Sequence, residues 1–157
     1  MKNFELLLCF LMCVLPCVFT DEPIFDDEFT KAAKAFDITR EEMVECLNKF
    51  NLTYKSFIQL SRVLSLEKIP ETRNLVRKAG CIGACLAKKN AVLVDSKIIT
   101  ERVMELATQL VDLPEDLAAL RTSVKACSKR AADRTDECDV VYTFVHCVIH
   151  ETAATVH

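Results

Sequence analysis

The sequence predicts an all-α protein, a bundle of helices cross-linked by disulfides. Apolar residues recur at intervals of three and four through most of the chain, which is the period of an amphipathic helix. After residue 20 the chain contains six cysteines, Cys46, Cys81, Cys85, Cys127, Cys138 and Cys147. Their spacing is typical of a disulfide framework around packed helices. No repeat or long linker divides this part of the chain, so we expect one domain.

The first twenty residues resemble a secretory signal peptide. A short apolar run over residues 6–18 follows Lys2 and is shorter than the roughly 20 residues that cross a bilayer. Three of the nine cysteines lie in this run, so its removal leaves an even six. We predict a signal peptide over residues 1–20 and a secreted mature domain over residues 21–157, with a membrane anchor as the alternative.

Local signals mark several helix starts. Thr39 with Glu42 forms a capping-box pattern ahead of a helix. Pro70 suits the first turn of a later helix, and Asp95 or Ser96 is a suitable cap for the helix after that one.

Apolar stripes predict which helix faces point inward. We expect Leu75 and Leu113 to begin two inward stripes. The last helix, from about Asp136 to His150, is apolar nearly all the way round and should lie inside the bundle. Its β-branched residues would also suit a strand, but its length and the capping Asp136 favour a helix.

The sequence lacks the patterns of an enzyme or of a nucleic-acid-binding protein. It contains no GxSxG, no HExxH and no phosphate-binding glycine loop, and its net charge of -3 comes without a basic stripe. A zinc site would need a second short-spaced pair beside Cys81 and Cys85, and the sequence has none. We therefore expect no catalysis, no cofactor, no metal and no nucleic-acid partner.

Helix geometry limits how the cysteines pair. Cys81 and Cys85 are one turn apart on one helix, where a bond between them would distort that helix. Cys138 and Cys147 are about 13.5 Å apart along another, beyond the roughly 7 Å limit for a disulfide. Excluding both bonds leaves ten of the fifteen possible pairings, and each of the ten ties the helix of Cys81 and Cys85 to other elements.

The cysteine spacing as a set resembles that of the six-cysteine insect odorant-binding proteins, which include pheromone-binding and general odorant-binding proteins. Three residues separate the second and third cysteines and eight separate the fifth and sixth, and a leader precedes the helices. The resemblance implies six helices around an apolar cavity. It also implies three disulfides, Cys46–Cys85, Cys81–Cys138 and Cys127–Cys147.

Twelve residues are candidates for the wall of such a cavity. Positions counted from the cysteines, as the resemblance implies, are Val124, Phe144 and Val148. Inward stripes add Phe57, Leu60, Leu64, Ile82, Leu86, Val103, Leu106, Leu120 and Tyr142. Ordinary core packing is the alternative for each of them. The Tyr142 hydroxyl is suited either to orient a polar ligand head or to bond a backbone carbonyl.

Three other residues are candidates for a pH switch or for glycosylation. His146 and His150 are four apart on the last helix, a spacing that suits charge at the helix C-terminus or a pH switch for ligand release. Asn51 begins a glycosylation sequon that ends at Thr53. The long interval between the first two cysteines predicts an extended loop around residues 65–72.

The function that the resemblance implies is that of an extracellular carrier. It would bind a small apolar odorant or pheromone and take it through aqueous lymph to an olfactory receptor, as a monomer or homodimer. Two alternatives stay open, a secreted helical protein with a packed core that acts on a protein partner, and the same carrier in a non-olfactory fluid.

Overall fold

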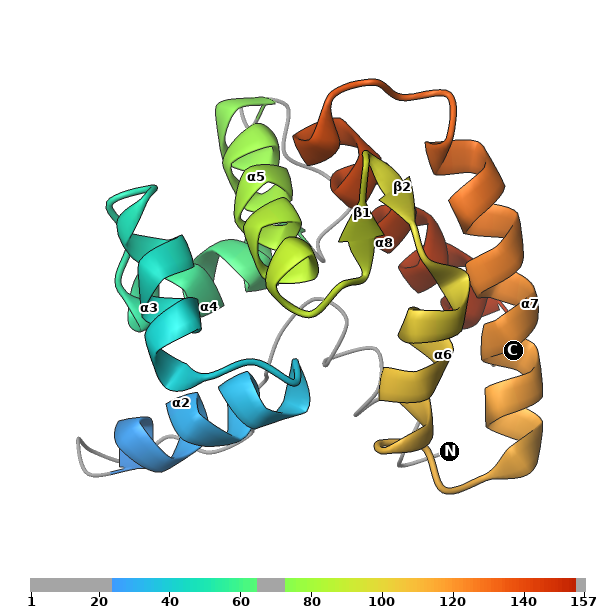
Figure 1. The fold of residues 1–157 in the computed structure, drawn as a ribbon, viewed down its shortest axis with the longest axis horizontal. Helices are drawn as coiled ribbons and strands as arrows, with labels where there is room; N and C mark the ends of the chain where they lie inside the picture. Colours follow the sequence, from blue (N-terminus) through green and yellow to red (C-terminus); the bar gives the residue numbers. More distant parts are fainter. Residues whose placement is uncertain (1–23, 65–72, 155–157) are drawn as a thin grey trace.

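The structure, a computed structural model, describes residues 24–64 and 73–154 (Figure 1). Its elements are α2 (Ile24–Ala35), α3 (Arg40–Asn48), α4 (Tyr54–Leu64), α5 (Arg73–Lys89), β1 (Leu93–Val94), β2 (Lys97–Ile98), α6 (Thr100–Thr108), α7 (Pro114–Ala131) and α8 (Glu137–Ala154). The all-α class is confirmed, although these residues form seven helices rather than six, with one short hairpin. The expected signal peptide, Pro70 and the loop around residues 65–72 lie outside the described residues.

Two helix starts that the sequence predicts are formed by local hydrogen bonds. The backbone N–H of Thr39 donates to the Glu42 carboxylate at 2.8 Å, and the Glu42 N–H donates to Thr39 Oγ1 at 3.1 Å. At α8, Asp136 Oδ1 accepts the N–H groups of Cys138 and Asp139 at 3.0 and 3.2 Å. Both caps are confirmed because each needs only residues within one turn.

The predicted cap of α6 is wrong. Asp95 and Ser96 form the turn between β1 and β2, with φ values of 49° and 59°. Positive φ at both central residues is what a two-residue hairpin of the primed type requires. The hairpin therefore occupies the two residues, and α6 starts after Ile99, which makes no side-chain capping bond.

The apolar interior is divided into two clusters, one on each side of the molecule (Figure 1). The N-terminal cluster consists of Phe29, Ala32, Ala33, Ile38, Met43, Cys46, Leu47, Phe57, Ile58, Ile82 and Leu86. The C-terminal cluster consists of Ala84, Ala87, Leu93, Val103, Met104, Ala107, Val111, Leu120, Val124, Cys127, Ala131, Val140, Val141, Phe144, Cys147 and Val148. Within the described residues, only α5, which lies between α2–α4 and α6–α8, contributes helical residues to both.

The last helix lies inside the bundle, as predicted. α8 packs between α5 and α7 (Figure 1) and buries Val140, Phe144 and Val148. Two other predictions of inward stripes are wrong, because Leu75 is 43% exposed and Leu113 is 37% exposed. Leu75 stands in the first turn of α5, and Leu113 precedes α7, so both lie at helix ends rather than within a packed face.

Glycine and a disulfide bring α5 and α8 close together. A Cβ atom at Gly80 would overlap the backbone carbonyl oxygen of Cys138, so only glycine fits there. At Gly83 an added Cβ would lie 2.9 Å from Cγ1 of Val141. The disulfide Cys81–Cys138 joins the same two helices at this crossing.

Candidate functional site

The predicted wall residues are divided between the two clusters. Eight of the twelve are buried in one cluster or the other, namely Val103, Leu120, Val124, Phe144 and Val148 on the C-terminal side and Phe57, Ile82 and Leu86 on the N-terminal side. Leu60 and Leu64 lie on α4, but their side chains are outside the described residues. The eight side chains pack in the two cores, and their place in a cavity wall stays a prediction.

The other two predicted wall residues, Leu106 and Tyr142, belong to neither cluster. Leu106 is only 9% exposed yet belongs to neither cluster as described. It follows Arg102 by one helical turn, so both side chains lie on the same face of α6. Tyr142 lies beside α5, since a Cβ at Gly80 would be 3.1 Å from the Tyr142 Cβ. Partial burial raises the pKa of the Tyr142 hydroxyl.

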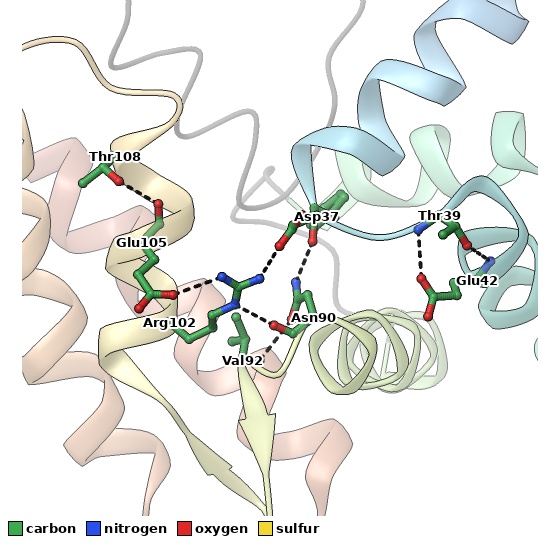
Figure 2. Close-up of polar contacts among 9 residues, drawn as sticks. Asp37, Thr39, Glu42, Asn90, Val92, Arg102, Glu105 and Thr108 are labelled. Carbon is green, nitrogen blue, oxygen red and sulfur yellow. Dashed lines mark hydrogen bonds and ion pairs between the residues drawn. The ribbon is translucent and has the colours of Figure 1, made fainter.

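A polar bridge formed by Asp37, Asn90 and Arg102 joins the two sides of the molecule (Figure 2). Arg102 Nε donates to the Asn90 carbonyl oxygen at 2.9 Å, and its guanidinium forms an ion pair with Asp37. Glu105 accepts a further bond from Arg102 Nη1 at 3.0 Å. The carboxylates of Glu105 and Asp37 raise the pKa of Arg102, so its guanidinium keeps its positive charge.

Asn90 is the buried centre of the polar bridge, with 6% exposure. Its Nδ2 donates to the Phe36 carbonyl oxygen at 3.1 Å, and its Oδ1 accepts the Val92 N–H at 3.1 Å (Figure 2). The end of α5, the turn after α2 and the start of the hairpin therefore share one side chain. Sequence reasoning missed the bridge because no local pattern relates Asp37 to Arg102, which is 65 positions away.

The two histidines on α8 contact each other. Their Nε2 atoms are 3.1 Å apart, and the His146 ring lies 5.5 Å from the Tyr142 ring between centroids. A hydrogen bond between two Nε2 atoms needs one of them unprotonated, so protonation of both rings would break it. Ligand release at low pH stays a prediction, which equal ligand affinity at about pH 5 and pH 7 would contradict. Among the described residues no group of three or more metal-binding side chains occurs.

A pocket of about 400 Å³ opens to solvent between α2, α3 and α4. It is lined by Phe29, Arg40, Val44, Leu47, Asn48, Leu52, Thr53, Tyr54 and Lys55, none of which is a predicted wall residue. Asn51, the residue of the predicted glycosylation site, is exposed beside it in the turn between α3 and α4. One face of α3 carries Arg40, Val44 and Leu47 at helical spacing, and these three residues line the pocket. This stripe was the sequence signal for the pocket, although Val44 is exposed rather than buried.

Comparison with known families identifies the fold. The model of the PBP/GOBP family matches residues 29–151, from α2 to α8. The chain belongs to the PBP/GOBP family. This is the insect odorant- and pheromone-binding family, whose members are binding proteins rather than enzymes. No curated protein and no solved structure matches the chain.

The resemblance drawn from the cysteines to the PBP/GOBP proteins is confirmed by this match. In the structure Cys46 is bonded to Cys85, Cys81 to Cys138 and Cys127 to Cys147, the same pairing that the resemblance implies. Helix α5 is thereby bonded to α8 through Cys81 and to α3 through Cys85. No helix in the described ranges is long and apolar enough to cross a membrane.

Proposed function

We propose that this PBP/GOBP protein is an extracellular carrier of small apolar ligands, odorants or pheromones, which it takes through aqueous lymph to a receptor. The family match over residues 29–151 is the observation that carries the proposal. Three disulfides support secretion, because disulfides persist in oxidising compartments. The predicted signal peptide over residues 1–20 would direct the chain there.

In our proposal the ligand lies between the two clusters. Leu106 and Tyr142 would contact it directly, with Val124, Phe144 and Val148 in the wall behind them. Burial of about ten CH₂ groups at roughly 0.8 kcal/mol each gives about 8 kcal/mol, of which several kcal/mol are lost with ligand freedom. We therefore expect an affinity in about the micromolar range, with modest selectivity between homologous chains.

A single introduced tryptophan tests this location, because the natural chain has none. Leu106→Trp should transfer energy to the apolar probe N-phenyl-1-naphthylamine when the probe binds, and long-chain alcohols or esters should reverse the effect. Val94→Trp is the matched control, since Val94 is exposed on the hairpin, and it should respond at least about fivefold less. Probe uptake that affects both tryptophans equally would contradict the proposed location.

Dense packing favours a second candidate function. Eight of the predicted wall residues already belong to the buried clusters, which suits a packed helical protein that acts on a protein partner. Failure of the unmodified protein to take up any apolar probe would support this alternative. Tissue expression would separate olfactory lymph from another fluid as the place where a carrier works.

A further inference from the structure

We propose that the pocket between α2, α3 and α4 is a second ligand site, which binds a single-chain carboxylate such as a medium-chain fatty acid. This site is separate from the interior location proposed above, because no described residue of its lining belongs to the predicted wall. Its size, its apolar floor and its charges each support the proposal.

The pocket has the size and floor of a small-molecule site. Its volume of about 400 Å³ lies within the roughly 300–1,000 Å³ usual for such sites. Phe29 and Leu47 are buried members of the N-terminal cluster and form the floor with Leu52 and Tyr54. The rings of Phe29 and Tyr54 meet edge to face, with centroids 4.7 Å apart. An acyl chain would therefore lie on a surface that is already packed from behind.

The charged groups at the pocket are cationic. Among the described residues, its lining contains Arg40 and Lys55 and no acidic side chain. The Arg40 guanidinium carbon lies 5.2 Å from the centroid of the Phe29 ring, so the positive charge stands over the apolar floor. A carboxylate can accept paired hydrogen bonds from a guanidinium and a further bond from an ammonium.

Lys55 stands where a helix disfavours a cation. It is the second residue of α4, whose first turn contains no acidic residue, whereas Arg40 begins α3, whose first turn also contains Glu41 and Glu42. The N-terminal end of a helix carries partial positive charge, so a cation there is repelled and an anion is attracted. A bound carboxylate would interact favourably with both side chains and with the N-terminal end of α4. The charge pattern thus favours an anionic amphiphile over a neutral one.

The two tyrosines of the chain give a reporter for each location. Tyr54 lines the pocket, whereas Tyr142 lies on α8 near the proposed interior ligand. Protein labelled with ¹³C at tyrosine gives two ring signals in NMR spectra, which Tyr142→Phe assigns. On titration with decanoate the Tyr54 signal should shift and saturate. Decanol, which lacks the charge, should need at least about tenfold higher concentration for the same shift.

Charge removal provides the decisive comparison. Arg40→Gln with Lys55→Gln should weaken the Tyr54 response to decanoate by about tenfold or more, because the charge-assisted hydrogen bonds are lost. Arg121→Gln with Lys125→Gln, two exposed residues of α7, changes the net charge equally and should leave the response as it was. Thermal unfolding of all variants checks that the fold is retained.

The results separate this site from the proposed carrier function. An unmoved Tyr54 signal during decanoate binding, or an Arg40 and Lys55 variant that binds as tightly as the natural protein, would overturn the second site. Displacement of N-phenyl-1-naphthylamine from the interior should be the same in the natural protein and in that variant. If the natural protein takes up no probe, the carrier function would be rejected. The Tyr54 titration would still test the second site independently.

Discussion

The two sides of the molecule are held together differently. Around the C-terminal cluster, Cys81–Cys138 and Cys127–Cys147 tie α8 to both of its neighbours. Around the N-terminal cluster one disulfide, Cys46–Cys85, ties α3 to α5, and the pocket opens between α2, α3 and α4. The two sides share helix α5, and the polar bridge adds a second connection, from the turn after α2 to α6.

In the proposed carrier this difference would combine stability with ligand uptake. Cross-links restrict the unfolded chain and hold the C-terminal side as a stiff wall. The N-terminal side has fewer covalent restraints, so its helices can adjust at lower cost.

Removal of disulfides should have the largest effect. Cys81→Ser with Cys138→Ser opens a loop of 57 residues, and Cys46→Ser with Cys85→Ser opens one of 39. Loop-closure entropy predicts a loss of about 4 kcal/mol in the free energy of unfolding for each, measurable by urea denaturation. Hydrogen exchange should accelerate only in α2–α4 for the second variant. Equal acceleration in α7 and α8 would show that this disulfide does not restrain the N-terminal side alone.

Substitution of the glycines tests the packing of α5 on α8. Gly80→Ala should lower the free energy of unfolding by about 2–3 kcal/mol, because its Cβ meets backbone that the neighbouring disulfide holds. Gly83→Ala is the control. Its Cβ meets only a side-chain methyl, and the helix gains about 1 kcal/mol in propensity, so the net change should stay within about 1 kcal/mol. Equal losses would show that the close approach is not the cause.

Arg102→Gln tests the polar bridge. It removes the ion pair with Asp37 and the bond to the Asn90 carbonyl oxygen, which should cost about 1–2 kcal/mol of unfolding free energy. Bound apolar probe should dissociate faster, since the bridge joins the two sides, as stopped-flow fluorescence would measure. Arg121→Gln, at an exposed position of α7, should change stability by less than about 0.5 kcal/mol. An unchanged dissociation rate would show that the bridge does not control release of the probe.

The smallest effect concerns Tyr142 at alkaline pH. Burial raises the pKa of its hydroxyl in the folded state, so the unfolded chain loses this proton first and stability falls as the pH rises above about 10. Absorbance at about 295 nm in Tyr54→Phe should therefore show an ionisation above the usual range of tyrosine. Bound ligand should move it higher still by excluding more water. A titration at the ordinary pKa would argue against a partly buried hydroxyl.

Much of the fold was predictable because its signals are local. The Thr39–Glu42 capping box and the Asp136 cap each depend on one turn of chain. The hairpin at Asp95 and Ser96 was not predictable in this way, because the same residue types suit a helix cap and a tight turn. Pairing of β1 with β2 decided between them.

The candidate site was less predictable than the fold. Periodicity identified Val124 and Phe144 as buried residues, but it cannot distinguish a core residue from the wall of a cavity, since both face inward. The pocket between α2, α3 and α4 was missed because its lining comes from several elements that no pattern within one segment connects.

By itself the sequence determined the all-α class, the family and the starts of two helices, because cysteine spacing, apolar period and caps are properties of the chain itself. Tertiary structure alone decided which inward residues belong to which cluster. It also brought Asp37 to Arg102 and Arg40 over Phe29. Contacts of this kind depend on how helices cross, which follows from the packing of the whole bundle and leaves no pattern within any one segment.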